Sequence, residues 1–152
     1  MSFGTSAAKP ARAEELKATV EALADGTLTA RAYCESCLAR VRADEAVIKA
    51  WAVLDEDRAR AIAATRDVRD VHGPLHGIPV GVKDIFDTDD LPTEMGSPVF
   101  VGNRPVKNAR LVERIVAAGG YAFGKTATAE FAFMHPAETS TALSTDMLTS
   151  AV

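Results

Sequence analysis

The sequence predicts an α/β protein in which a small mixed sheet is flanked by helices. Helix-type patterns dominate the first half of the chain, and short apolar runs alternate with them in the second half. The run from Ile78 to Val82 is rich in β-branched residues and is bounded by glycine and proline, as is typical of a buried strand. With 152 residues, of which 47% are hydrophobic and 25% charged, the chain is suited to one domain.

The first half is expected to form three helices and one short strand. They span residues 11–24 (helix), 30–43 (helix), 49–54 (strand) and 55–71 (helix). Gly26 can end the first helix, and Thr29 and Asp55 are suitable N-caps for the other two. Residues 1–10 are small and polar, so we expect a flexible N-terminus.

The second half is expected to alternate strands with helices after a turn at 72–74. The segments are 78–82 (strand), 87–102 (loop), a helix after Asn108 that ends at Ala118, 121–124 (strand) and 126–134 (short helix). Residues 140–152 form an atypical tail rich in serine and threonine. Residues 1–152 are therefore expected to form a single domain.

A lysine directly follows the apolar strand. Because side chains alternate along a strand, Ile78, Val80, Val82 and Asp84 should share one face and Lys83 the other, together with two glycines. A buried lysine is costly unless it is paired or neutral, and a neutral amine can act as a base. Lys83 is thus a candidate catalytic base. A lysine whose amine reaches solvent at a strand end, or a Schiff-base lysine, is an alternative.

Four segments carry a more specific pattern. They are Gly-Pro-Leu-His-Gly-Ile-Pro-Val-Gly-Val-Lys-Asp (73–84), Leu-Pro-Thr-Glu-Met-Gly-Ser (91–97), Ala-Ala-Gly-Gly-Tyr-Ala-Phe-Gly-Lys-Thr (117–126) and Glu-Phe-Ala (130–132). In this order and spacing they resemble the amidase signature family, over roughly residues 28–139. The resemblance implies the N-terminal part of the amidase signature fold and hydrolysis or transfer of amides.

The resemblance also implies a Ser–cis-Ser–Lys site with Lys83 as the base and no metal or cofactor. The family's two serines lie in a Gly-Gly-Ser-Ser-Gly-Gly type loop, which this sequence lacks. We therefore expect an amidase portion that carries the catalytic lysine and is inactive in isolation. Its substrate, once completed, would be a small-molecule amide. The alternative is a non-catalytic binding or split-enzyme module that needs a complementary chain or associates with itself.

Residues 119–126 also match the phosphate-binding pattern G-x-x-x-x-G-K-[ST] in every letter. That loop must follow a strand and open a helix, so that backbone N–H groups at the helix start hold the phosphate. Here the expected order is reversed, with a helix before Gly119 and a strand inside the motif. The sequence therefore disfavours nucleotide binding at Lys125.

Three other groups of residues have ordinary explanations. Cys34 and Cys37 lie on one apolar helix face and lack the further ligands of a zinc site. The acidic cluster Asp87, Asp89 and Asp90 is typical of a solvated loop. The serines of the tail are Ser140, Ser144 and Ser150. They have no neighbouring glycine-rich loop that could form an oxyanion hole.

Charge and hydropathy argue against two classes of partner. The net charge of −4 disfavours nucleic acid and anionic membranes. No apolar run reaches the roughly 18 residues that a membrane span needs, and no signal peptide is visible. We expect a cytoplasmic protein.

Overall fold

The structure is a computed structural model and describes residues 12–68, 70 and 73–133. Its elements are α1 (Arg12–Ala24), α2 (Ala30–Ile48), β1 (Trp51–Val53), α3 (Glu56–Asp67), β2 (Pro79–Lys83), η1 (Pro98–Phe100), α4 (Arg110–Ala117), β3 (Tyr121–Thr126) and η2 (Glu130–Ala132), where η is a 3-10 helix. The predictions for the flexible N-terminus, for the tail at 140–152 and for its three serines lie outside the described residues.

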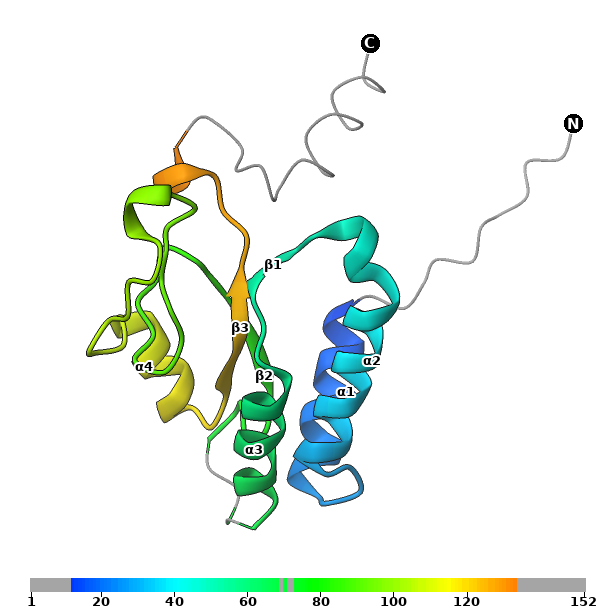
Figure 1. The fold of residues 1–152 in the computed structure, drawn as a ribbon. Helices are drawn as coiled ribbons and strands as arrows, with labels where there is room; N and C mark the ends of the chain where they lie inside the picture. The colour runs from blue at the N-terminus through cyan, green and yellow to red at the C-terminus, as the bar shows by residue number, and fades with distance from the viewer. Residues whose placement is uncertain (1–11, 69, 71–72, 134–152) are drawn as a thin grey trace, which may run out of the picture.

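The three strands form one mixed sheet with β3 at its centre. β1 pairs with β3 in antiparallel orientation, and β2 pairs with β3 in parallel orientation. Helices α1 and α2 lie on one side of the sheet and α4 on the other (Figure 1), with α3 packed against α2 and β3. The predicted small mixed sheet flanked by helices is confirmed.

Alternating side chains of β3 supply the two halves of the core. Tyr121 and Phe123 pack with α1, α2 and α3, whereas Ala122 packs with Val112 of α4. The larger cluster consists of Leu23, Ala30, Cys34, Leu38, Ala59, Ala63, Ile78, Tyr121 and Phe123. Small residues of α2 and α3 allow these helices to approach closely. The central strand is therefore covered on both faces.

The predicted N-caps are confirmed by hydrogen bonds. The Thr29 side chain accepts a bond from the Ala32 N–H, and the Asp55 side chain accepts one from the Arg58 N–H. Helix α2 continues to Ile48, past the predicted end at 43, because no glycine or proline follows and Glu45 and Ala46 are strong helix formers. It ends at Lys49, whose positive φ of 50° closes the helix.

Other elements begin or end at residues that differ from the prediction. Helix α3 ends at Asp67 rather than at 71, and β2 is shifted by one residue to 79–83. Strand β3 runs to Thr126 instead of ending at Gly124, because its last residues pair with the end of β2. The expected short helix at 126–134 is a 3-10 turn at 130–132.

Strand β2 departs from the predicted alternation of faces. Ile78 packs in the larger cluster, whereas Val82 packs in the smaller one beside α4. The register of β2 against β3 shifts between Val80 and Gly81, so the prediction of one shared face is wrong. After the register shift the alternation of faces continues, since Gly81 is exposed and Val82 is buried.

Among the described residues, no helix combines the length and the hydrophobicity that a membrane span requires.

A network of charges ties α2 to α3. The Glu56 carboxylate accepts hydrogen bonds from Arg42 and from Arg60, the latter at 2.7 Å, and Arg60 also donates to Glu35 at 2.7 Å. The guanidinium groups of Arg42 and Arg60 lower the pKa of Glu56 from 4.5 to about 2. The network is partly exposed, so salt should screen it in part.

Replacing Glu56 by glutamine should lower stability at neutral pH and have less effect in acid. Because its pKa is lower in the folded chain, Glu56 stabilises the fold above pH 4.5, and this contribution is lost as the pH falls toward about 2. Urea unfolding at several pH values would measure the difference between wild type and Glu56→Gln. Asp44→Asn, on an exposed carboxylate of α2, is the control. A difference that stays constant down to pH 2 would contradict this account.

Candidate active site

Lys83 and Asp84 lie at the carboxyl end of β2, beside the end of β3. Lys83 is the register partner of Thr126, and the Asp84 N–H donates to the Thr126 carbonyl oxygen at 3.0 Å. Lys83 is exposed, whereas Asp84 is only 2% exposed. The predicted separation of the two side chains onto opposite faces is confirmed.

The Lys83 side chain itself is not buried, contrary to the sequence-based expectation. Its amine makes no hydrogen bond or ion pair with any residue in the described parts of the chain. It lies on the same face as Gly81, where a methyl group would approach the Thr126 methyl within 3.1 Å. The end of β2 thus presents a free amine beside a position without a side chain.

The buried lysine is Lys125, in the apolar strand β3. Its side chain is 0% exposed, and its Nζ lies 3.0 Å from Asp84 Oδ1. The same amine donates to Thr93 Oγ1 at 2.5 Å and to the Pro92 carbonyl oxygen at 3.2 Å. Burial lowers the pKa of Lys125, and the Asp84 carboxylate opposes that shift. The Asp84 carboxylate also accepts a bond from the Glu94 N–H at 3.2 Å.

The sequence-based prediction misses this ion pair because it ends the strand at Gly124, which leaves Lys125 outside the buried strand. A signal for it was present, since a lysine inside a buried apolar strand requires a buried partner. The strand alternation had already placed Asp84 on the face opposite Lys83. Asp84 was therefore a carboxylate that the sequence could have offered as the partner of Lys125.

The loops that follow β2 and β3 are tied together near this site. Ser97 Oγ donates to Glu130 Oε1 at 2.7 Å, and the Phe131 N–H donates to the Met95 carbonyl oxygen at 2.9 Å. Gly96 has a φ of +63°, and a side chain there would meet the Thr128 carbonyl oxygen at 2.6 Å. Glycine is therefore required where the two loops meet.

The phosphate-binding alternative is not supported by the order of elements. Helix α4 precedes Gly119, and Gly124, Lys125 and Thr126 all belong to β3. No helix begins at Lys125, so no row of free N–H groups faces a phosphate there. The amine that would bind phosphate is instead paired with Asp84.

The cysteines have structural surroundings, as predicted, and Asp89 and Asp90 of the acidic cluster are exposed, as expected of a solvated loop. Cys34 is fully buried in the core, Cys37 is partly buried, and burial raises the pKa of both thiols. Asp90 pairs with Arg58. Within the described ranges, no group of three histidine, cysteine, aspartate or glutamate side chains is arranged to hold a metal ion.

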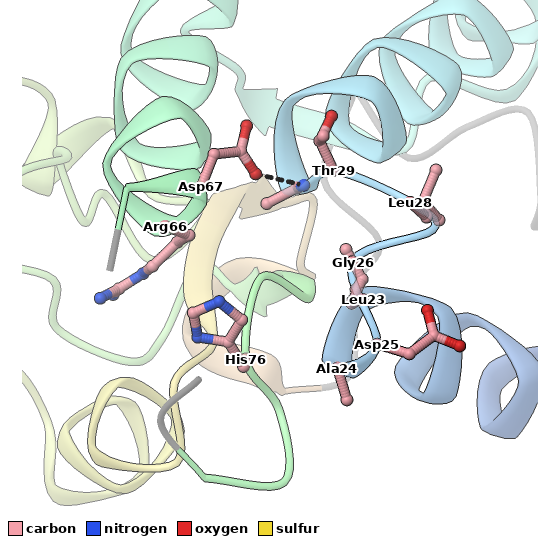
Figure 2. A pocket seen from close by; sticks show the side chains of 10 residues that line it. Leu23, Ala24, Asp25, Gly26, Leu28, Thr29, Arg66, Asp67 and His76 are labelled. Carbon is pink, nitrogen blue, oxygen red and sulfur yellow. Dashed lines mark hydrogen bonds between the residues drawn. The ribbon is translucent and has the colours of Figure 1, made fainter. Parts of the chain in front are cut away.

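A separate cavity of about 310 Å³ lies where α1 ends and α2 begins. Figure 2 shows Asp67 of α3 reaching the first residue of α2, where its carboxylate accepts a bond from the Ala30 N–H at 2.6 Å. The same carboxylate accepts the Arg31 N–H at 3.2 Å and so caps the helix. Neither Lys83 nor Lys125 lines this cavity.

Comparison with known proteins identifies the family. Residues 32–146 match the family model described as Amidase. The chain belongs to the amidase family. This match contains the lysine-bearing strand end, both loops and the buried ion pair described above.

Two similar proteins are much longer than this chain. A glutamyl-tRNA(Gln) amidotransferase subunit of Chloroflexus aurantiacus is 44% identical over 123 residues, which are 78% of this chain and 25% of the relative. An amidase of Pseudomonas putida is 42% identical over 103 residues, which are 65% of this chain and 22% of the relative. The chain thus spans about a quarter of the length of the curated relatives that it matches.

Solved structures agree with the fold. A structure described under the heading "An unexpected vestigial protein complex reveals the evolutionary origins of an s-triazine catabolic enzyme" is 35% identical, with a TM-score of 0.71. The likeness covers 76% of this chain and 26% of that one. The predicted N-terminal part of the amidase fold is confirmed.

Proposed function

We propose that this chain is the lysine-bearing portion of an amidase and that Lys83 is the general base of a Ser–cis-Ser–Lys site. The main support is the geometry at the end of β2. Lys83 projects outward with a free amine, while the neighbouring carboxylate of Asp84 is turned inward to Lys125. A base needs an amine that a serine hydroxyl can approach and that no carboxylate holds in the charged form.

The proposed chemistry is an acyl transfer. The neutral amine of Lys83 accepts a proton from a bridging serine, which accepts one from the nucleophilic serine. The serine oxygen attacks the amide carbonyl carbon, the C–N bond breaks, and the amine leaves with a returned proton. Water then hydrolyses the acyl-enzyme. No metal or cofactor takes part in these steps.

Both serines must come from outside this sequence, because it has no Gly-Gly-Ser-Ser-Gly-Gly type loop. The substrate class is a small-molecule amide, whose side chain would be recognised by the serine-bearing portion. We therefore expect residues 1–152 to be inactive by themselves and to require the serine-bearing portion.

A second candidate, a module whose role is association, is favoured by the surface near the site. Large apolar side chains are exposed on the loops after β2 and β3, namely Val99, Val101, Val106, Phe131 and Phe133. Strand β2 has one neighbour in the described sheet, which leaves its other edge unpaired. Exposed apolar side chains and an open strand edge are typical of surfaces that pack against another chain or another copy.

Complementation tests the proposed function. The chain would be mixed with the part of the Chloroflexus aurantiacus relative that follows the matched region, and amide hydrolysis would be followed by release of amine from a panel of simple amides. We expect neither part to hydrolyse amides alone and the mixture to do so. Hydrolysis by the 152-residue chain alone would contradict the proposed need for a second portion. A mixture that associates without hydrolysis would favour the association role.

A further inference from the structure

Lys83, the last residue of β2, and Asp84, which follows it, face Thr126 and Lys125 of β3 at the candidate site. On the outer face, Lys83 is the partner of Thr126. On the inner face, the Asp84 carboxylate meets the amine of Lys125 at 3.0 Å, and both side chains are almost completely buried. The face of the sheet on which the Lys83 side chain lies is therefore linked to the ion pair that the Asp84 carboxylate forms with Lys125.

The register at this strand end is not dictated by the first part of the ladder. Val80 pairs with Ala122, but the next residue, Gly81, pairs with Gly124, so β3 advances by two residues while β2 advances by one. A further slip by one residue would exchange the two faces of the strand end. Lys83 would then point inward and Asp84 outward.

The buried ion pair makes such a slip costly. Lys125 is 0% exposed, and among the described residues only the Asp84 carboxylate forms an ion pair with its amine, while Asp87 and Asp90 act on it from farther away. A slipped strand would bring the amine of Lys83 toward that of Lys125 and leave two amines in the interior without a directly paired carboxylate. The other contacts of Lys125, with Thr93 and Pro92, supply no negative charge.

We propose that Asp84 and Lys125 are positioning residues, whose buried pair fixes the register at the end of β2 and so directs Lys83 to the outer face. That this orientation matters for catalysis rests on the proposed function, in which Lys83 is the general base. The register itself is independent of it and can be measured in the 152-residue chain without any activity.

Nuclear magnetic resonance of the labelled full chain tests the proposal with Lys125→Met, which removes the charge at similar length. In wild type we expect proton contacts between the Lys83 side chain and the Thr126 methyl, and a slowly exchanging Asp84 amide. In Lys125→Met these contacts should weaken or appear as two sets. The rate of amide exchange at Asp84 should rise about tenfold or more, which corresponds to a decrease of about 1.4 kcal/mol in the opening free energy.

Two controls separate register from general stability. Leu38→Val removes one methylene from the core cluster and no charge, and Glu35→Gln removes a carboxylate from an ion pair that is partly exposed. Both should keep the wild-type contacts between Lys83 and Thr126. A change in these contacts as large as that in Lys125→Met would overturn the proposal.

The double variant Asp84→Asn with Lys125→Met decides the case if the single variant does not fold. It removes both charges and retains an amide oxygen that can accept the Glu94 N–H. We expect it to fold with heterogeneous contacts at Lys83, because a neutral pair no longer penalises the slip. A folded double variant with wild-type contacts would overturn the proposal, as would failure of the double variant to fold. Intact activity in Lys83→Ala would instead refute the proposed function and leave the register result standing.

Discussion

Replacing Lys83 by alanine should abolish amide hydrolysis by the complemented enzyme. A positioned general base contributes about 10²–10⁴-fold to a rate, so kcat should fall by about that factor. The side chain is exposed, and its amine makes no hydrogen bond or ion pair with the described residues, so neither folding nor association of the two parts should change. Steady-state kinetics together with sedimentation of the mixture would measure both.

Two matched variants sharpen this test. Lys83→Arg keeps a positive charge but cannot act as a base, because arginine stays protonated, and it should be as inactive as Lys83→Ala. Lys107→Ala removes an exposed lysine from the loop before α4 and should retain full activity. Activity in Lys83→Arg equal to wild type would show that the site needs the charge of this side chain rather than its basicity.

Truncating Leu38 to alanine should be the most destabilising single change in the core. Leu38 of α2 is 0% exposed and belongs to the cluster that joins α2, α3 and the sheet. Shortening leucine to alanine at such a site costs ~2–5 kcal/mol, through lost burial and the cavity left behind. Small domains have only about 5–15 kcal/mol of stability, so this loss can unfold the chain near body temperature.

Urea unfolding followed by circular dichroism would measure the effect. Leu16→Ala in α1 is the control, because Leu16 is 46% exposed and should lose little burial. We expect a large shift of the unfolding midpoint in Leu38→Ala and a small one in Leu16→Ala. Equal shifts would show that the cluster around Leu38 is not the main core of the chain.

Local sequence signals predicted most elements because each element depends on its own residues. Thr29 and Asp55 were recognisable as N-caps from residue type and position, and both cap their helices. The predicted ends of elements were wrong where residues far away in the sequence determine them. Strand β3 extends through Lys125 because its backbone pairs with the parallel strand β2 and because the Asp84 carboxylate offsets the cost of burying the lysine amine.

The family and the candidate base were accessible from the sequence, since both depend on an ordered set of short segments. The sequence also placed Lys83 and Asp84 on opposite faces, because side chains alternate along any strand. Only the tertiary structure decided which face is inner. It exposes Lys83, buries Lys125 against Asp84 and shifts the register between Val80 and Gly81. These features depend on how β2 pairs with a strand that lies much later in the chain, a long-range choice that no local pattern encodes.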